Sequence, residues 1–455
     1  MPPKRRRPRP ASPSPQPAPD RDDHDQSPSL AEEQEPGEEE DVPFYNITFT
    51  AHRVSPLYLG TGNGPLTAIR LALLAQRLRD RLVGDVVRGV EVGGGPSGGP
   101  EDGGAMMMMG GRAGALEGVE MRWVDVAGGV LGFSANREGE VVEGLQGKKA
   151  LHIALRYEMA VCTALLLPRL LAEEKTTGER GGGFGTRLFA VGTGAGTVDE
   201  MDWERDVDPD RFLELPLLLL RMPAPLQAIV GEFLATAFDC RITPMRLGTR
   251  TLVRSWEAWI RSAGLPDRGS LAKDMVLTLG FYLPPQDRSS LAQAGPSDED
   301  ATKAEQPLGL KSIDVIIPAG ELQKFVAAGK RLNTSQHGKT QASPWGWEND
   351  VKKRRILAGR LYEEGWAWRT DDEGSPEQQP FTEALACYLK EHLALNLFHP
   401  GVRVAKIACS GFAISDTRVK VFTPADSGDG LGPRGAVVEL IGRLAEKAQV
   451  STAGS

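Results

Sequence analysis

The sequence predicts an α+β fold in which a largely antiparallel, curved sheet is flanked by helices, after a disordered N-terminal tail. Helical and strand patterns alternate along the 455 residues, but without the regular strand–helix–strand rhythm of a doubly wound parallel fold. No internal repeat of fixed period is present. Near the C-terminus, two strand patterns joined by a turn at Ser410-Gly411 lie between two helical patterns.

Residues 1–42 are predicted to form the disordered tail, because prolines and charges leave too little apolar surface to offset the conformational entropy of folding. The segment opens with a basic cluster and closes with an acidic run from Glu32 to Asp41. The cations of this cluster are Lys4, Arg5, Arg6, Arg7 and Arg9. Such a cluster is typical of a nuclear localisation signal, and equally of a solvated run of charge.

Residues 43–283 are predicted to form an N-terminal α+β domain. Alternating aromatic and β-branched residues predict a strand over 44–54, and a flexible glycine-rich insertion is expected at about 91–116. A helix over 66–83 is predicted from apolar residues at helical spacing. These residues are Leu66, Ile69, Leu73, Leu74, Leu78 and Leu82. Further strands are expected at 121–126, 130–133, 149–157, 187–191 and 275–283, and further helices at 165–174, 225–238 and 249–263.

A polar, proline-punctuated linker is expected at 284–308, and residues 309–455 are predicted to form a C-terminal α+β domain. Its clearest helix covers 381–397, where apolar residues recur every four positions. The other elements expected in this domain are strands at 311–317, 402–408 and 412–422, and helices at 320–328, 348–364 and 436–450.

Composition limits the classes of function. The formal net charge is −8, so nucleic acid would have to bind a local basic patch. The cysteines are not spaced for metal or disulfide chemistry and are interpreted as free thiols. They are Cys162, Cys240, Cys387 and Cys409. The apolar run from Phe212 to Met222 is shorter than the roughly 20 residues that span a bilayer, and no signal peptide pattern is present. We therefore expect a soluble intracellular protein with no metal and no cofactor.

Two glycine clusters raise the alternative of a nucleotide-binding enzyme. The turn from Gly60 to Gly64 lies between a predicted strand and a predicted helix, which is the context in which helix N-termini bind phosphate. Its spacing is not that of the dinucleotide fingerprint, and no acidic residue follows at the ribose-binding distance. The second cluster, Gly192 to Gly196, precedes an acidic stretch that would repel phosphate. Because no nucleophile or acid–base constellation accompanies them, a non-catalytic protein is favoured and the nucleotide-binding enzyme is kept as the alternative.

Two basic clusters are candidate nucleic-acid sites. One lies on the predicted helix 348–364 near four tryptophans, a combination that binds nucleic acid in other proteins. The other lies on the polar face of the helix 66–83. Their residues are Lys352, Lys353, Arg354, Arg355, Arg70, Arg77 and Arg81. The competing interpretation is that both helices are solvated and that the tryptophans pack in the core.

Residues 44–60 read F-Y-N-I-T-F-T-A-H-R-V-S-P-L-Y-L-G, an aromatic strand that runs into a basic residue and then S-P-L-Y. This stretch resembles the opening of fungal centromere protein L homologues. The matching residues are Phe44, Tyr45, Asn46, Thr48, Phe49, Arg53, Val54, Ser55, Pro56, Leu57 and Tyr58. The resemblance implies a structural subunit of the inner kinetochore in the nucleus, at the centromere of the chromosome.

The resemblance also implies partners. Members of this family pair with centromere protein N through their C-terminal region by extending a sheet, which makes residues 309–455 the expected dimerisation domain of a hetero-oligomer. Edge strands are natural templates for such pairing. The partner-binding residues implied here are Val402, Val404, Lys406, Phe412, Ile414, Val419 and Val421. The family further implies contact with centromeric DNA or the nucleosome, for which the two basic clusters are the candidates.

Overall fold

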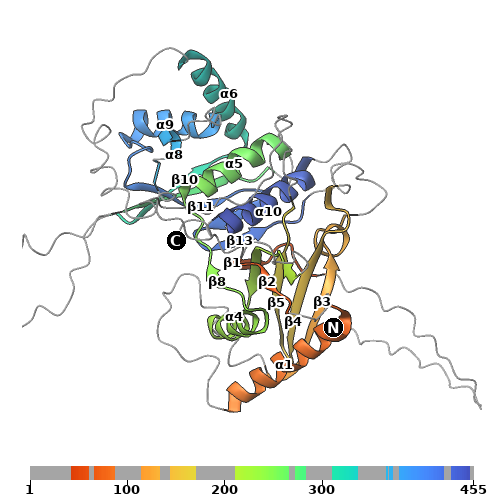
Figure 1. The fold of residues 1–455 in the computed structure, drawn as a ribbon. Helices are drawn as coiled ribbons and strands as arrows, with labels where there is room; N and C mark the ends of the chain where they lie inside the picture. Colours follow the sequence, from red (N-terminus) through yellow and green to blue (C-terminus); the bar gives the residue numbers. More distant parts are fainter. Residues whose placement is uncertain are drawn as a thin grey trace, which may run out of the picture. The chain divides into compact units, whose positions relative to one another are not determined.

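The fold is seen in a computed structural model of the chain (Figure 1). It describes residues 42–60, 66–87, 114–133, 144–170, 211–265, 272–282, 310–336, 365–366, 368–371, 379–424 and 432–450. Residues 41–455 form one compact unit. Several predicted features lie outside the described residues: the tail up to residue 41, most of the insertion, the strand 187–191, the linker 284–308 and the helix 348–364. Val42, counted in the predicted tail, is buried and donates its N–H to Gly129 O at 3.1 Å.

The dominant element is a large open sheet in which every pair of neighbouring strands is antiparallel. Its strand order is β10-β9-β11-β12-β13-β1-β7-β5-β4-β3, and β8 also pairs with β1. The strands are β1 Thr48–Val54, β3 Leu116–Asp125, β4 Lys149–Tyr157, β5 Ala160–Leu167, β7 Leu217–Arg221, β8 Ile242–Pro244, β9 Met275–Phe281, β10 Ser312–Ile317, β11 Val402–Ala408, β12 Phe412–Ser415 and β13 Arg418–Val421. A separate small sheet pairs β2 Leu57–Tyr58 with β6 Phe212–Leu213.

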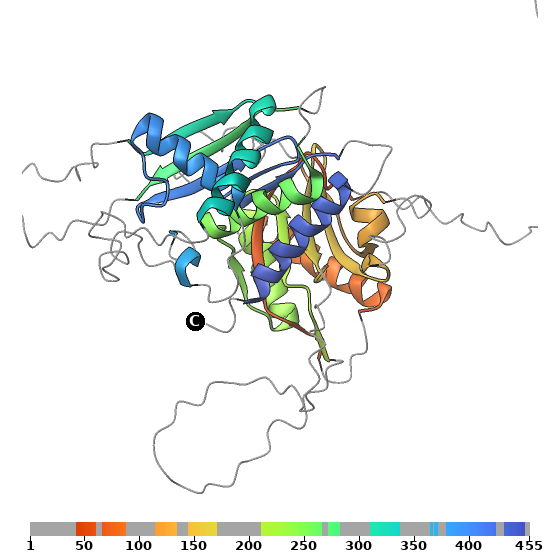
Figure 2. The ribbon, with the colours of Figure 1, turned by 90° about the horizontal axis from the view of Figure 1, so that it is seen from above.

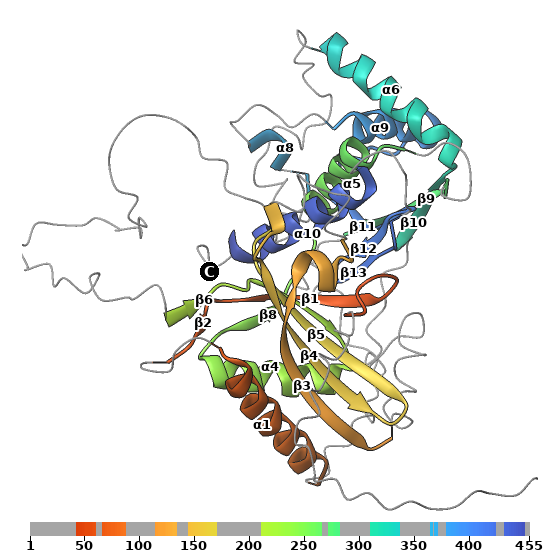
Figure 3. The same ribbon diagram turned by 90° about the vertical axis from the view of Figure 1, so that its right-hand side faces the viewer.

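Helices lie against both faces of the sheet. The helical elements are α1 Ala68–Val87, the π-helix η1 Val126–Val130, α4 Ala224–Phe238, α5 Thr249–Ala263, α6 Ala319–Gln336, α8 Trp368–Asp371, α9 Pro380–Leu393 and α10 Gly432–Val450. Figure 2 shows α5 (green) and α10 (blue) side by side, and Figure 3 shows α1 and α4 at the end of the sheet that carries β3, β4 and β5. Helices α6 and α9 contact each other. The predicted α+β class with a large antiparallel sheet is therefore confirmed.

Two hydrophobic cores lie on opposite faces of the sheet, and alternation along each strand decides which core a side chain enters. In β1, Phe49 and Ala51 enter the core beneath α5 and α10, whereas Val54 enters the core beneath α1 and α4. In β7, Leu217 and Leu219 enter the first core, whereas Leu218 and Leu220 enter the second. A strand buried on both faces needs a continuous apolar run, which explains the leucine tract of β7.

Several predictions about individual elements are wrong. The strand expected at 130–133 is not formed, because the π-helix η1 runs to Val130 and a turn follows it. The single strand expected at 412–422 is divided into β12 and β13. The helix expected at 165–174 is not formed over its described part, because β5 runs to Leu167 and is buried between β4 and β7.

The helix expected at 66–83 exists as α1, and four of the six residues of its predicted stripe are buried: Leu66, Leu74, Leu78 and Leu82. Ile69 is 76% exposed and Leu73 is 55% exposed. The residues that α1 buries are Leu71, Leu74, Ala75, Leu78 and Leu82. The predicted stripe is therefore right at Leu74, Leu78 and Leu82 and wrong at Ile69 and Leu73.

The sheet runs through both ranges that were predicted to be domains. Strand β9, from the first range, pairs with β10 and β11, which belong to the second. Strand β1 pairs with β13 in the same way. The division into two domains with a linker at 284–308 stays a prediction. Among the described helices, none is both long and apolar enough to cross a membrane.

Candidate partner edge and basic sheet face

Strand β10 forms one end of the large sheet and pairs with β9 on one side. Its β-branched sequence alternates about the sheet plane: Ile313, Val315 and Ile317 lie on one face, and Ser312, Asp314 and Ile316 lie on the other. Ile316 is 63% exposed. The strand ends before Pro318, which has no backbone N–H and so cannot donate a hydrogen bond to a neighbouring strand. An edge strand with an exposed apolar residue is a template for another chain.

The face of β9, β11, β12 and β13 turned away from the helices is called the open face. Its outward residues are Val276, Thr278, Gly280, Arg403, Ala405, Lys406, Ala408, Ala413, Ser415, Arg418 and Lys420. None of these residues is buried, whereas their neighbours in sequence on the same strands enter the core. The open face therefore presents four cations, Arg403, Lys406, Arg418 and Lys420, on adjacent strands.

Aromatic rings lie beside some of these cations. The Arg403 Cζ lies 4.1 Å from the centroid of the Tyr282 ring. The Nζ atoms of Lys420 and Lys273 lie 5.2 Å and 5.5 Å from the centroid of Phe422. Cation–π contacts hold the cationic groups near the sheet surface. At the β10 end, Thr278 Oγ1 donates to Asp314 Oδ1 at 2.6 Å, which ties β9 to β10 through side chains.

The strands β11, β12 and β13, on which partner binding was predicted, lie inside the sheet, and each is paired on both sides. Six of the predicted residues are buried beneath the helices: Val402, Val404, Phe412, Ile414, Val419 and Val421. Phe412, for example, lies 5.2 Å from the ring of Trp259 on α5. Lys406 alone among the seven is exposed, on the open face. The assignment of these seven residues to partner binding stays a prediction. The edge strand at this end of the sheet is β10, which β9 separates from β11.

The predicted DNA-binding arginines lie on α1, which contacts β3 at the other end of the sheet. Arg70 Nη2 donates to Leu59 O at 2.7 Å. Arg81 Nη2 pairs with Glu232 Oε1 at 2.7 Å, and Arg77 is exposed. Two of the three arginines therefore tie α1 to neighbouring elements. The second cluster, Lys352, Lys353, Arg354 and Arg355, lies outside the described residues, as do residues 61–65 of the Gly60 turn and the whole Gly192 to Gly196 cluster.

Sequence reasoning missed three cations of the open face. Arg403, Arg418 and Lys420 alternate with buried valines in the segments V-R-V and R-V-K-V. That period of two was the available signal, because in a strand it turns apolar and charged residues to opposite faces.

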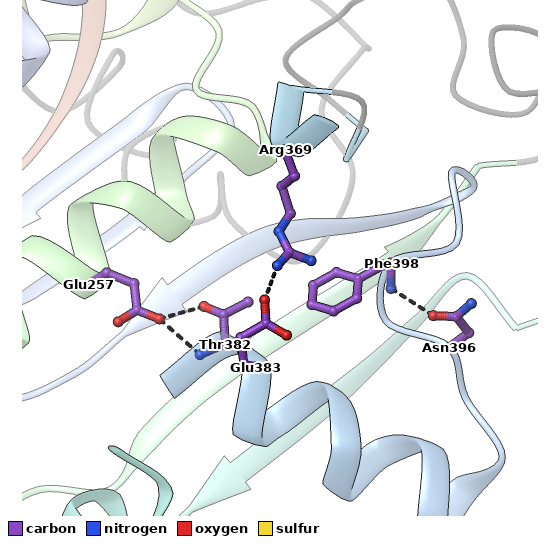
Figure 4. Close-up of polar contacts among 6 residues, drawn as sticks. All are labelled: Glu257, Arg369, Thr382, Glu383, Asn396 and Phe398. Carbon is purple, nitrogen blue, oxygen red and sulfur yellow. Dashed lines mark hydrogen bonds and ion pairs between the residues drawn. The ribbon is translucent and has the colours of Figure 1, made fainter. Parts of the chain in front are cut away.

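A buried polar cluster fixes the helices behind this part of the sheet (Figure 4). Glu257 Oε1 on α5 accepts hydrogen bonds from Thr382 N and Thr382 Oγ1, both at 2.8 Å, and so caps the N-terminus of α9. Arg369 on α8 pairs with Glu383 and lies 3.8 Å from the centroid of Phe398. Burial raises the pKa of Glu257, although the bonds from Thr382 oppose the rise, and burial lowers the pKa of Arg369 to about 10. The contacts join α5, α8 and α9 into one support.

The described residues contain no group of three or more His, Cys, Asp or Glu side chains that could hold a metal ion. Instead, the described residues place the open face, none of whose outward residues is buried, at the same end of the sheet as the edge strand β10. The family model for centromere protein L matches residues 43–449. The chain therefore belongs to the centromere protein L family, a structural kinetochore family, and is a nuclear component of the centromere and kinetochore. The sequence matches no curated protein.

The family match confirms the resemblance found at residues 44–60. The residues of that stretch have structural contacts: Phe44 stacks on Phe49 with centroids 6.0 Å apart, and Tyr45 Oη donates to Leu131 O at 3.0 Å. Leu57 is fully buried, and the Tyr58 ring lies 5.4 Å from that of Phe212. The stretch thus builds the centre of the sheet and the small β2–β6 ribbon.

Proposed function

We propose that this chain is a non-catalytic inner-kinetochore subunit that pairs with a centromere protein N-type partner through the edge of β10 and contacts centromeric DNA through the open face. The observation that carries the proposal is that an edge strand with an exposed Ile316 adjoins a sheet face with four cations. A single surface of the molecule then offers both a template for a strand and a counter-charge for phosphate.

Pairing at β10 is supported by main-chain chemistry. The outer edge of β10 is paired with no strand among the described residues, so its N–H and C=O groups are available to a partner strand. An added strand would place side chains against Ile316 and remove its apolar surface from water, which favours association. On this proposal, the predicted partner-binding residues around Val402 and Phe412 contribute indirectly, because their packing in the core stabilises the strands β11 and β12 next to β9 and β10.

Contact with DNA is supported by the positive charge of the open face, which contrasts with the negative net charge of the chain. The net charge of −8 opposes nonspecific binding by the chain as a whole, whereas the cations of the open face are spaced across neighbouring strands. Lysine and arginine that neutralise phosphates release counterions and supply sequence-independent affinity. Arg70, Arg77, Arg81 and the cluster from Lys352 to Arg355 are proposed as additional contacts.

The pairing proposal is tested with Ile316→Lys and a matched control. Both Ile316 and Ile69 are exposed isoleucines, but Ile69 lies on α1, far from β10 in the strand order. Burying an isoleucine contributes about 1.5–3 kcal/mol, so Ile316→Lys is expected to weaken binding of the full chain to its centromere protein N-type partner by about tenfold or more. Ile69→Lys is expected to leave the affinity unchanged, as measured by isothermal titration calorimetry.

Equal affinities for the two variants would contradict pairing at β10. Hydrogen exchange provides a second measurement that does not depend on a substitution. The partner is expected to slow exchange in residues 312–317, and slowing confined to β3, the other end of the sheet, would move the interface there.

A further inference from the structure

Three cationic side chains from distant parts of the chain meet beside the first turn of α5. Lys447, near the end of α10, donates from Nζ to Thr251 Oγ1 at 2.6 Å, which brings it next to Arg250. Arg53, at the end of β1, lies on the same face as Phe49 and Ala51 by alternation, and that face contacts α10. Arg53, Arg250 and Lys447 are called the cation cluster.

The surrounding contacts fix each member of the cation cluster. The backbone of Arg53 is paired with β7 on one side and β8 on the other. The Arg250 Cζ lies 6.0 Å from the centroid of Trp368, which is almost fully buried. Thr249 Oγ1 accepts a hydrogen bond from Val404 N at 3.0 Å and so attaches the start of α5 to β11. The sheet and α5 therefore position the backbones that carry Arg53 and Arg250.

The electrostatics of the cluster favour an anion. Burial, together with the nearby Arg53 and Arg250, lowers the pKa of Lys447 to about 7. Burial also lowers the pKa of Arg53, whose Nε atom is buried and has no hydrogen-bond partner among the described residues. The positive charges of Arg53 and Arg250 disfavour the protonated form of Lys447, and an anion with several acceptor oxygens opposes this effect.

We propose that the cation cluster binds a phosphate monoester carried by a phosphorylated serine or threonine of a protein segment. The inference does not depend on pairing at β10 or on DNA contact at the open face. A phosphomonoester carries a charge of about −1.5 to −2 at neutral pH and three acceptor oxygens, which suits three converging cations. Lys447 and Arg53 are half-buried, so a single phosphorylated side chain reaches them more readily than the outer backbone of a duplex.

Protonation of Lys447 makes the binding pH-dependent. Lys447 faces Arg250 on α5 and Arg53 on β1. Arg254 follows Arg250 by one turn on α5, and the charged neighbours of Lys447 on α10 are Glu446 and Arg443. With a pKa of about 7, Lys447 is largely neutral in alkaline solution. A bound anion favours the charged amine, so binding above that pKa takes up a proton and affinity falls as the pH rises.

The test uses the full chain and two probes at constant ionic strength: sulfate, which does not titrate in this range, and N-acetyl-phosphoserine amide. Each probe is expected to bind saturably in calorimetry, and Lys447→Gln or Arg250→Gln is expected to weaken it by about tenfold or more, as for the loss of a charge-assisted hydrogen bond. Lys324→Gln, a surface change on α6, is the control and is expected to have no effect. Sulfate affinity of the unmodified chain is expected to fall between about pH 6 and about pH 8.5.

Lys447→Arg separates a binding site from a merely structural lysine. Arginine stays protonated throughout this range, so this variant is expected to bind sulfate without the pH dependence and without proton uptake. The proposal is overturned if neither probe stabilises the chain more than chloride does, or if Lys447→Arg keeps the pH dependence of the unmodified chain. It is also overturned, in favour of a DNA source of the phosphate, if duplex DNA displaces the phosphoserine probe and loses affinity in parallel in Arg250→Gln.

Discussion

The two halves of the large sheet differ in how their faces are covered. In the covered half, formed by β3, β4, β5 and β7, side chains on both faces enter a core, and β7 is buried along Leu217–Leu220. In the open half, formed by β9 to β13, one face lies beneath helices and the other meets solvent. Strand β13 shows the result: Val419 and Val421 are buried, and Arg418 and Lys420 point outward. One half therefore buries side chains on both of its faces, whereas the other buries them on one face only; on the function proposed above, its second face is the surface for recognition.

The largest difference between the two halves is expected in the loss of stability when one side chain is shortened in each half, both on the same side of the sheet. Leu218 in β7 is fully buried beneath α1 and α4, whereas Val276 in β9 lies on the open face. Leu218→Ala is expected to lower the free energy of unfolding by about 2–5 kcal/mol, since it removes packed atoms and leaves a cavity. Val276→Ala is expected to lower it by less than about 1 kcal/mol. Urea unfolding of the full chain measures both, and similar losses would show that the open face is covered in the folded chain.

A second difference is expected in the dependence of stability on pH. His152 lies buried in β4, and burial together with Arg122 and Arg156 lowers its pKa to about 4. The unfolded chain, with a histidine pKa of about 6.5, binds the proton more tightly. The stability contributed by neutral His152 is therefore fully present above about pH 6.5. It is lost as the pH falls toward 4, and the total loss is up to about 3 kcal/mol.

The pH effect is measured with His152→Leu and a matched control on α9. Neither ring nitrogen of His152 has a hydrogen-bond partner among the described residues, so leucine is expected to preserve the fold and remove this part of the pH dependence. Leu393→Gln, an exposed position on α9 that carries no titratable group, is expected to leave the dependence as it is in the unmodified chain. An unchanged profile in His152→Leu would assign the acid sensitivity to other groups.

The smallest effect concerns the charge of the open face. Lys406→Gln together with Lys420→Gln is expected to reduce the slope of log affinity for duplex DNA against log salt by roughly 2, because each phosphate contact contributes about 0.9. The paired control, Lys324→Gln with Lys390→Gln, changes the same charge on α6 and α9. Fluorescence anisotropy across a salt series measures the slopes. Equal slopes in the two double variants would show that the cations of the open face do not contact DNA.

Much of the fold could be predicted from local patterns. Alternation located β1, β4, β9, β10 and β11, and helical periodicity located α4, α5, α9 and α10. The prediction failed at β5, where the apolar run around Leu165 fits a buried strand and a helix equally well. It also failed at Ile69 and Leu73 in the stripe of α1, because the side of a helix that meets the sheet depends on packing that no local pattern records.

The candidate site was less accessible to sequence reasoning. The order of strands is a property of the whole sheet, so the sequence of β11 to β13 gave no indication that both sides are paired. Lys406 was found, whereas Arg403, Arg418 and Lys420 were not weighed against the valines between them. The cation cluster joins Arg53, Arg250 and Lys447 across nearly the whole chain, and only the fold brings them together.

The position of β1 in the middle of the sheet has a consequence for how the chain folds. Asn46, just before β1, donates from Nδ2 to Thr423 Oγ1 at 2.8 Å, although the two residues are 377 positions apart. Contacts of such long range slow folding, since a large loop must close before they form. During synthesis, one side of β1 has to wait for β13, which leaves the ribosome long after β1. Until then, the unpaired strand is exposed to misassembly, so timely folding of the C-terminal strands protects the chain from aggregation.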